Sequence, residues 1–441
     1  MLFQLYDDFG QSPWLDNLRR EWITSGRLQE WVDSGVRGLT SNPSIFEKAI
    51  STSDAYDKQF KDLILSDRSV EEAYWELVIT DIAGAANILN PVYQKSNGTD
   101  GFVSVEVDPR FARDTSRTIE AARSLNNQLD LPNIYIKIPG TAEGIPAIRQ
   151  MISEGVSVNV TLLFSVDRYE QVIEAYLSGL EQREGDLSDV SSVASFFISR
   201  TDSEVDKRLE IIGGATAIDL KGKTAVAQGQ LAYRSFLKAF ESDRWKALEK
   251  RGAKLQRPLW ASTSTKDPQY PDTLYVDSLI GPNTVNTLPD ITLEAFVDHG
   301  TLKRTVDVDF DAAEQVVREV ENLGINLDEV AYLLESQGVE AFENSFENLL
   351  ETLSAKGNEY SFVIKPTAGP GSFMPVNKNG VQRGHRPFVA FFDQRLEDIR
   401  IVSGLEHDPV ITDNFILVPN PPNRKMAKEI KIAFEAKVRG V

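Results

Sequence analysis

Residues 133–139, with the sequence NIYIKIP, constrain the fold more than any other segment of the chain. Their alternation predicts a β-strand with Ile134, Ile136 and Ile138 on one face and Lys137 on the other. A lysine on such a strand carries a large desolvation cost unless it is paired, neutralised or used. Lys137 is therefore either a snorkelling side chain on a half-buried strand or a functional group inside the protein.

Two further segments, 102–107 and 156–161, alternate valines with polar residues in the same way. The polar residues are Ser104, Glu106, Ser157, Asn159 and Thr161. An antiparallel sheet with one solvated face would give this pattern too. However, long helical patterns separate the strands, which favours parallel pairing with both faces covered. The polar face would then look into a barrel, and its polar residues near the strand ends would form an active site.

The whole chain reads as eight strands, each followed by one or more helical segments, which is the order of a (β/α)8 TIM barrel. The expected strands are 13–16, 36–40, 102–107, 133–139, 156–161, 193–198, 258–261 and 284–287. Helical patterns at 311–322 and 327–353 would close the barrel. We therefore expect residues 1–354 to form one α/β barrel domain with extra helices.

The composition excludes several classes of protein. No stretch is apolar enough for a membrane span, and the N-terminus lacks the basic and apolar leader of a signal peptide. The absence of cysteine excludes disulfides and fits a cytoplasmic protein. A net charge of −19 argues against nucleic acid as a partner. The three histidines, His299, His385 and His407, share no metal-ligand spacing, so we expect no metal site.

Short motifs at the expected strand ends, taken together, resemble the transaldolases, most closely the longer bacterial branch with Trp-Leu-Asp near its start. The motifs are WLD (14–16), LTSNPS (39–44), VEVD (105–108), IKIPGTAEG (136–144), NVTLLFS (159–165), SFFISR (195–200), WAST (260–263) and PNTVNT (282–287). Each motif alone is weak, but their order and spacing are specific. The resemblance covers residues 1–354.

The resemblance implies an enzyme that transfers a dihydroxyacetone unit between sugar phosphates through a lysine Schiff base. The donor would be sedoheptulose 7-phosphate or fructose 6-phosphate, and the acceptor glyceraldehyde 3-phosphate or erythrose 4-phosphate. This reaction belongs to the non-oxidative pentose phosphate pathway. It implies sugar phosphates as partners and neither a metal nor another cofactor.

The resemblance also assigns catalytic roles. Lys137 holds the position of the Schiff-base lysine, whose neutral amine attacks the ketose carbonyl. Asp16 occupies the position of the general acid and base in carbon–carbon bond cleavage. Glu106 and Thr161 would hold a water molecule that carries protons during imine formation and hydrolysis. A plain salt bridge to Lys137 is the structural alternative for Glu106.

Four further residues would bind the substrate. Asn42, Asn159 and Ser195 suit the hydroxyl groups of the dihydroxyacetone unit, although Asn and Ser also commonly cap loops and helices. Arg200 has the planar, permanently charged fork that binds a sugar phosphate. A surface salt bridge is the alternative for Arg200.

The end of strand seven departs from the pattern of the shorter transaldolases, in which a serine followed two residues later by a basic residue helps to hold phosphate. Here Ser262 opens the run STST (262–265), and the basic residue is Lys266. Lys266 either takes the phosphate role from one step further along or lies on the surface. Its polar surroundings make it a poor candidate for the imine.

Two other functions stay open. An aldolase of the same superfamily, a fructose-6-phosphate aldolase, would release free dihydroxyacetone. That branch tends to have a tyrosine on strand six and a glutamine on strand three, where this chain has Phe197 and Glu106, which favours transfer. A catalytically inactive barrel could serve as a binding scaffold, but the intact set of Asp16, Glu106 and Lys137 argues against it.

Residues 355–441 exceed what the resemblance leads us to expect. They contain short strand patterns at 361–364, 388–392 and 415–418, and a basic amphipathic helical pattern at 424–438. We interpret them as a C-terminal extension for packing or oligomerisation. The sequence assigns neither its role nor the oligomeric state.

Overall fold

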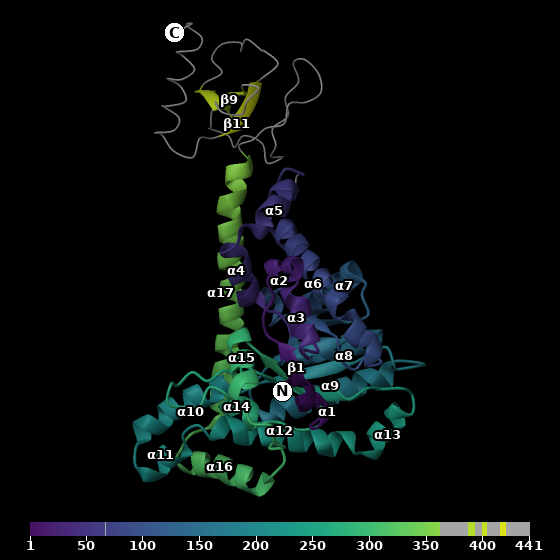
Figure 1. Cartoon of the computed structure of the whole chain (residues 1–441), viewed down its shortest axis with the longest axis vertical. Helices are drawn as coiled ribbons and strands as arrows, with labels where there is room; N and C mark the ends of the chain where they lie inside the picture. Colours follow the sequence, from purple (N-terminus) through teal and green to yellow (C-terminus); the bar gives the residue numbers. More distant parts are fainter. Residues whose placement is uncertain (67, 362–386, 393–398, 404–414, 420–441) are drawn as a thin grey trace. The chain divides into compact units, whose positions relative to one another are not determined.

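The computed structural model describes residues 1–66, 68–361, 387–392, 399–403 and 415–419 (Figure 1). The chain forms two compact units. The first contains Met1–Ser53 and Val78–Asn348, and the second contains Asp54–Leu77 and Leu349–Val441.

The first unit is built on a closed barrel of eight parallel strands in chain order, which confirms the predicted (β/α)8 fold. The strands are β1 Gln11–Leu15, β2 Leu39–Thr40, β3 Val103–Glu106, β4 Ile134–Pro139, β5 Val158–Leu163, β6 Ser192–Phe197, β7 Gln256–Ala261 and β8 Thr284–Leu288. All eight expected strands are present, with bounds that differ by a few residues. Because the strands are parallel, their C-terminal ends lie together at one end of the barrel.

Helices surround this barrel (Figure 1). They are α1 Leu2–Asp7, α2 Arg20–Ser25, α3 Arg27–Asp33, α4 Pro43–Ser51, α7 Thr115–Leu129, α8 Gly144–Glu154, α9 Val166–Gln182, α10 Ser199–Ile212, α11 Ala215–Leu220, α12 Thr224–Phe240, α13 Asp243–Glu249, α14 Leu274–Asp277, α15 Asp290–His299 and α16 Phe310–Asn322, with a 3-10 turn η2 at Pro109–Phe111. Helix α7 packs against α8, α8 against α9, and α9 against α12. Two longer helices, α6 Val70–Lys95 and α17 Leu327–Ser361, have residues in both units.

The second unit also contains η1 Asp54–Tyr56, α5 Asp57–Ile64 and an antiparallel sheet of order β10-β9-β11. Its strands are β9 Pro387–Phe392, β10 Ile399–Ser403 and β11 Phe415–Pro419. The predicted strand patterns at 388–392 and 415–418 correspond to β9 and β11. Residue 361 ends α17, and residues 362–364 and the helical pattern at 424–438 lie outside the described residues. Helix α17 runs unbroken across the predicted boundary between residues 354 and 355.

Strand β4 leads into α8 through a turn that Thr141 supports. The Thr141 hydroxyl accepts a hydrogen bond from the Gly144 N–H at 3.0 Å and donates one to the Ala112 carbonyl at 2.6 Å. A Cβ on Gly144 would lie 1.9 Å from the Pro139 carbonyl oxygen, so only glycine fits this helix start. The turn thus fixes the direction in which β4 ends.

Aromatic rings fill the barrel on the N-terminal side of Lys137. Tyr135 lies two residues before Lys137 and therefore shares its face of β4. Its ring stacks on Phe102, with ring centroids 4.0 Å apart, and lies 6.0 Å from the ring of Trp14. All three rings are buried, so the lysine lies above an apolar layer.

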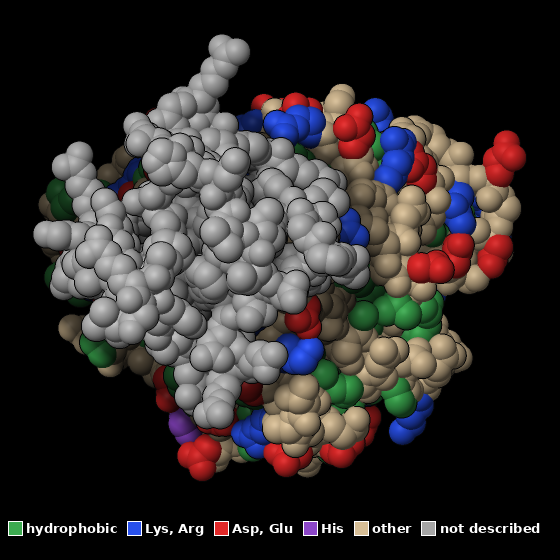
Figure 2. All heavy atoms as spheres, turned by 90° about the horizontal axis from the view of Figure 1, so that it is seen from above, with side chains coloured by type: hydrophobic (Ala, Val, Ile, Leu, Met, Phe, Trp, Pro, Cys, Tyr) green, Lys and Arg blue, Asp and Glu red, His purple; other side chains and the backbone are tan. Residues whose placement is uncertain are grey.

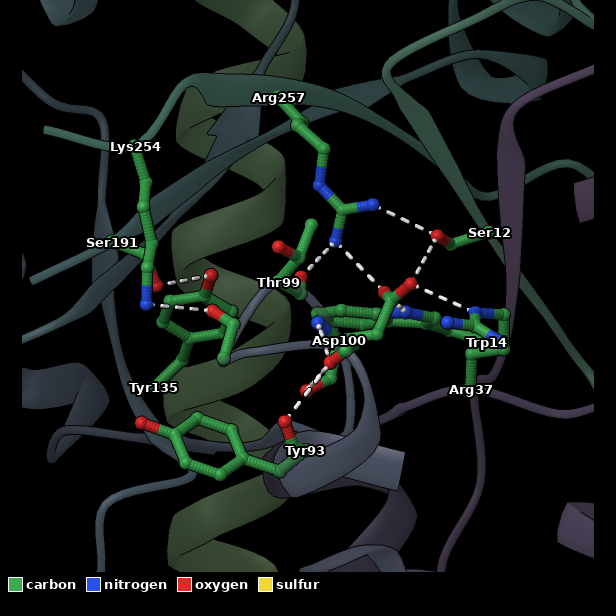
Figure 3. A network of polar contacts seen from close by, with 12 residues as sticks. Ser12, Trp14, Arg37, Tyr93, Thr99, Asp100, Tyr135, Ser191, Lys254 and Arg257 are labelled. Carbon is green, nitrogen blue, oxygen red and sulfur yellow. Dashed lines mark hydrogen bonds and ion pairs between the residues drawn. The ribbon is translucent and has the colours of Figure 1, made fainter. Parts of the chain in front are cut away.

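A buried polar network that the sequence analysis did not predict joins β1, β7 and the loop before β3 (Figure 3). The Asp100 carboxylate, which is 0% exposed, accepts hydrogen bonds from Arg257 Nη2 at 2.9 Å and Arg37 Nε at 2.8 Å. It also accepts from Ser12 Oγ at 2.7 Å and Trp14 Nε1 at 3.1 Å. Burial alone would raise the pKa of Asp100, but Arg257 and Arg37 outweigh it and hold the pKa below its usual range.

We expect Asp100→Asn to lower the free energy of unfolding by about 3–5 kcal/mol, because it leaves the buried Arg257 without its counter-charge. Because the native pKa of Asp100 is lowered, the ionised carboxylate stabilises the folded state fully above the unfolded pKa of about 3.9. This stabilisation is lost as the pH falls through the lower native pKa. Urea unfolding at a neutral and at a strongly acidic pH measures the effect. Asp219→Asn, which alters an exposed pair with Lys223, is the matched control. If wild type and Asp100→Asn differed as much in free energy of unfolding at acidic pH as at neutral pH, the prediction would be contradicted.

Candidate active site

Lys137 and Glu106 are paired neighbours at the C-terminal ends of β4 and β3. Lys137 Nζ lies 3.2 Å from Glu106 Oε2, and the two side chains are 5% and 2% exposed. The Lys137 ammonium also donates a hydrogen bond to the Ser41 carbonyl at 2.9 Å. The salt bridge considered for Glu106 is therefore present. Among the described residues neither Glu106 oxygen has an aligned hydrogen-bond partner, so the carboxylate keeps acceptor capacity.

Asp16 follows β1 and lies within the electrostatic field of Lys137. Burial raises the pKa of Asp16, and Lys137 lowers it in part. Burial also raises the pKa of Glu106, against the effect of Lys137, and Asp16 raises it further. Thr40 donates a hydrogen bond to Asp16 Oδ1 at 2.7 Å, and its hydroxyl lies 2.6 Å from that of Thr287. The site thus combines one amine with two carboxyl groups that bind protons more readily than exposed ones.

A chain of neutral polar groups continues along the inner face of the barrel. Asn159 is paired with Lys137 in the strand register. Its Oδ1 accepts a hydrogen bond from Ser195 Oγ at 2.7 Å, and its Nδ2 donates to Ser104 Oγ at 3.0 Å. All of these side chains are buried. Asn159 and Ser195 are thus oriented by each other, next to the lysine strand.

Thr161 lies at an irregularity of β5. The register between β5 and β6 shifts between Val160 and Leu163, and Leu162 has a left-handed backbone with φ of 61°. A bulge of this kind re-aims a side chain, and such bulges are common beside active sites. Thr161 is 0% exposed, and its hydroxyl has no hydrogen-bond partner among the described residues. The bulge therefore presents a buried hydroxyl that is free to bind a ligand.

Asn42 has the capping role that the sequence left open. Its Oδ1 accepts a hydrogen bond from the Ile45 N–H at 3.0 Å and caps α4, in which Pro43 is the first residue. Only the Asn42 amide Nδ2 remains for a ligand. The neighbouring Ser41 supplies the carbonyl that accepts from Lys137.

Two cations lie beside Asp16. Arg200 is in the first turn of α10, and Lys266 is in the segment between β7 and α14. Burial lowers the pKa of Lys266, and Arg200 lowers it further, whereas Asp16 raises it. Arg200 forms no ion pair or hydrogen bond within the described part of the chain, which contradicts the surface salt bridge considered for it. Its guanidinium lies 5.2 Å from the centroid of the Phe197 ring.

Ser262 follows β7 with a left-handed backbone, at φ of 56°. Its hydroxyl lies 3.0 Å from that of Ser199, and its carbonyl accepts a hydrogen bond from the Ser199 N–H at 3.0 Å. Ser262 therefore joins the end of β7 to the start of α10. The Lys266 ammonium donates to Ser264 at 2.7 Å.

Four residues that were not predicted from the sequence orient the predicted ones, namely Thr40, Ser41, Ser104 and Thr287. The alternation of β3 carried the signal for Ser104, which shares a face with Glu106. Thr40 and Ser41 lie within the LTSNPS motif. Thr287 ends the PNTVNT motif, but its contact with Thr40 had no local signal, because the two residues are 247 positions apart.

Three further observations concern the helices, the surface charges and metal binding. None of the helices in the described ranges combines the length and the apolar character needed to cross a membrane. On the part of the described surface that is visible in Figure 2, the Lys and Arg side chains are interspersed with Asp and Glu. A nucleic-acid interface would instead gather basic side chains into a patch. Within those same ranges no group of three or more His, Asp and Glu side chains is placed to bind a metal ion.

Comparisons with known proteins agree with this geometry. The sequence profile of the family described as Transaldolase/Fructose-6-phosphate aldolase matches residues 13–353. The chain is 50% identical over 356 residues to the transaldolase of Thermobifida fusca, which covers 80% of this chain and 97% of that protein. It is 49% identical over 350 residues to that of Frankia alni, covering 78% and 94%. It is 51% identical over 352 residues to that of Saccharopolyspora erythraea, covering 78% and 95%. The chain therefore belongs to the transaldolase/fructose-6-phosphate aldolase family.

Proposed function

We propose that this protein is a transaldolase in which Lys137 forms the Schiff base. It moves a dihydroxyacetone unit from sedoheptulose 7-phosphate or fructose 6-phosphate to glyceraldehyde 3-phosphate or erythrose 4-phosphate, in the non-oxidative pentose phosphate pathway. Relatives of this name match the chain over almost their whole length. The observation that carries the proposal is the buried pair of Lys137 and Glu106, with Asp16 close enough to influence the pKa of Glu106. This pathway and the absence of cysteine also lead us to propose a cytoplasmic location.

The first step needs the neutral amine of Lys137, because an ammonium has no lone pair. Glu106, 3.2 Å away and with a raised pKa, is suited to accept the proton. The amine then adds to the ketose carbonyl, and loss of one water gives the iminium. Glu106 and the free hydroxyl of Thr161 supply the acceptor and donor groups that would hold this water.

The second step breaks the bond between the third and fourth carbons of the sugar. Its electron pair moves into the iminium and gives an enamine, while the hydroxyl on the fourth carbon loses its proton and becomes the aldehyde. Asp16 would accept this proton, which its raised pKa favours. It returns the proton when the enamine attacks the acceptor aldehyde. Hydrolysis of the new iminium then consumes one water and frees Lys137.

Between the two aldoses the three-carbon unit has to stay on the enzyme. The hydrogen-bonded pair of Asn159 and Ser195 would bind its hydroxyl groups, together with the remaining amide of Asn42. The aldolase alternative would instead release the unit, with a tyrosine and a glutamine at the positions of Phe197 and Glu106. Phe197 lies in an apolar cluster, 5.2 Å from the ring of Phe164, and has no hydroxyl to donate a proton. This supports transfer.

Borohydride reduction in the presence of fructose 6-phosphate tests the proposal. Reduction of the trapped imine should add one three-carbon unit to the protein, on the peptide that contains Lys137. Without an acceptor aldehyde, little free dihydroxyacetone should appear in the solution. Steady release of dihydroxyacetone would indicate the aldolase, and an unmodified protein would overturn both.

We expect Arg200→Ala to weaken the apparent binding of phosphorylated sugars by about 1.5–3 kcal/mol, because its guanidinium forms no hydrogen bond or ion pair with the described residues and is available for charge-assisted hydrogen bonds. This corresponds to a rise in KM of roughly 10- to 150-fold. Steady-state kinetics with fructose 6-phosphate and with unphosphorylated dihydroxyacetone measures it. Arg208→Ala, which removes an arginine paired with Glu204 on the same helix, is the control and should leave KM unchanged. Equal losses on both substrates would mean that Arg200 supports the loop and that the phosphate binds elsewhere.

A further inference from the structure

Arg200 and Lys266 repel each other, and yet the fold keeps them close enough for Arg200 to lower the pKa of Lys266. Arg200 belongs to α10, and Lys266 belongs to the segment 262–273 that connects β7 to α14. Among the described residues Arg200 has no acidic partner that forms an ion pair. Asp16 attracts both cations, but it forms no ion pair with Arg200 in the described ranges, so direct contacts between the two segments have to add to this attraction.

Hydrogen bonds join the two segments on both sides of the cations. Before the cations, Ser199 and Ser262 are linked by a backbone hydrogen bond and by their hydroxyls, each at 3.0 Å. After them, the Tyr270 hydroxyl donates to Asp206 Oδ2 at 2.7 Å. Tyr270 lies four residues beyond Lys266, and Asp206 lies six residues beyond Arg200 on α10. Hydrogen bonds therefore join α10 to the segment 262–273 both before and after the two cations in the sequence.

The Tyr270 ring packs against a glycine that leaves room for it. Gly222, between α11 and α12, has a left-handed backbone with φ of 71°. A Cβ on Gly222 would lie 2.9 Å from Tyr270 Cζ, so the absence of a side chain makes room for the ring. The Gly222 N–H donates to Asp206 Oδ1 at 3.0 Å, which leaves Oδ2 for Tyr270. One carboxylate and one glycine therefore fix both the ring and its hydroxyl.

We propose that Tyr270, held by Asp206 and Gly222, is a positioning residue for phosphate recognition. It keeps the segment that carries Lys266 beside Arg200, so that a phosphate dianion meets two cations already in place. This inference rests on the proposed function, because it assumes that the substrate phosphate binds between Arg200 and Lys266. A preformed site avoids the cost of ordering a loop against charge repulsion when the substrate binds.

Tyr270→Phe tests the proposal. The KM for fructose 6-phosphate should rise about 3- to 10-fold, the effect of losing one hydrogen bond of ordinary net strength, while kcat is unchanged. Inhibition by inorganic phosphate should weaken by the same factor, and the reaction of unphosphorylated dihydroxyacetone should not change. Tyr176→Phe makes the same chemical change on α9, where the hydroxyl donates to the Lys254 carbonyl at 2.6 Å. This control should alter none of the three measurements.

Asp206→Ala gives an independent variant, since it removes the carboxylate that accepts from Tyr270. If the two residues act through their contact, the double variant should show the KM of either single variant. An unchanged KM in Tyr270→Phe, a fall in kcat on every substrate, or additive effects in the double variant would overturn the proposal. The borohydride adduct on Lys137 reports separately on the proposed function, because it forms on wild type whether or not Tyr270 has this role.

Discussion

Replacing Lys137 by arginine is expected to abolish transfer while the barrel stays folded. Arginine keeps a positive charge for Glu106, 3.2 Å from the present ammonium, so the buried carboxylate is not left alone. The guanidinium does not lose its proton at any working pH, however, and so it provides no nucleophile. We expect turnover to fall by at least about 10⁴-fold. A coupled assay of aldehyde formation and the mass after borohydride treatment measure this loss.

Lys266→Arg is the matched control for this experiment. It makes the same change at the other lysine of the site, whose expected role is to provide charge. The three-carbon adduct should persist in Lys266→Arg and disappear in Lys137→Arg, and both variants should unfold at nearly the wild-type temperature. Loss of the adduct in Lys266→Arg, with retention in Lys137→Arg, would mean that the Schiff base forms on the other lysine.

Glu106→Gln should slow turnover by roughly 10²–10⁴-fold with a small change in KM, because glutamine keeps the shape of the side chain but accepts no proton. The pKa of Glu106 is raised by burial and by Asp16, so activity that needs its carboxylate should decline in mild acid, at a higher pH than an exposed glutamate would give. The acidic limb of the wild-type profile belongs to Glu106 and Asp16 together. In Glu106→Gln that limb should shift to the pKa of Asp16 alone.

Glu204→Gln serves as the control for Glu106→Gln. It removes a carboxylate that is paired with Arg208 on α10, without a part in the proposed chemistry. Its kcat and pH profile should match those of wild type. If Glu106→Gln kept wild-type turnover, the contact with Lys137 would be a structural salt bridge, and the proton would have to go to another group.

The barrel could be predicted from the sequence because patterns within short segments indicate its strands and helices. Alternation along β3, β4 and β5 indicated which side chains face inward, and the intervening helical patterns implied parallel pairing. The same alternation selected Glu106, Lys137 and Asn159, which the structure places side by side in register. Their roles came from the resemblance and stay predictions.

Other parts of the site had no local signal. The left-handed backbone of Leu162 beside Thr161 occurs at a residue that normally avoids it, and nothing in the local sequence announces such a bulge. Lys266 follows a run of serines and threonines without periodicity, so its distance from Arg200 depended on the tertiary fold. The network at Asp100 was missed for a similar reason, because aspartate in a turn is ordinary until its distant arginine partners are known.

The Asp100 network also bears on the order in which the chain can fold. Arg257 lies 157 residues beyond Asp100 and 245 beyond Ser12, so its contacts form only after a long loop has closed. During synthesis the first six strands leave the ribosome before β7, and until then Asp100 has only Arg37 of the two arginines that make its burial favourable. We therefore expect the early strands not to close around Asp100 before β7 is present. Closure becomes a late, cooperative step that depends on nearly the whole barrel, as in other folds with distant contacts.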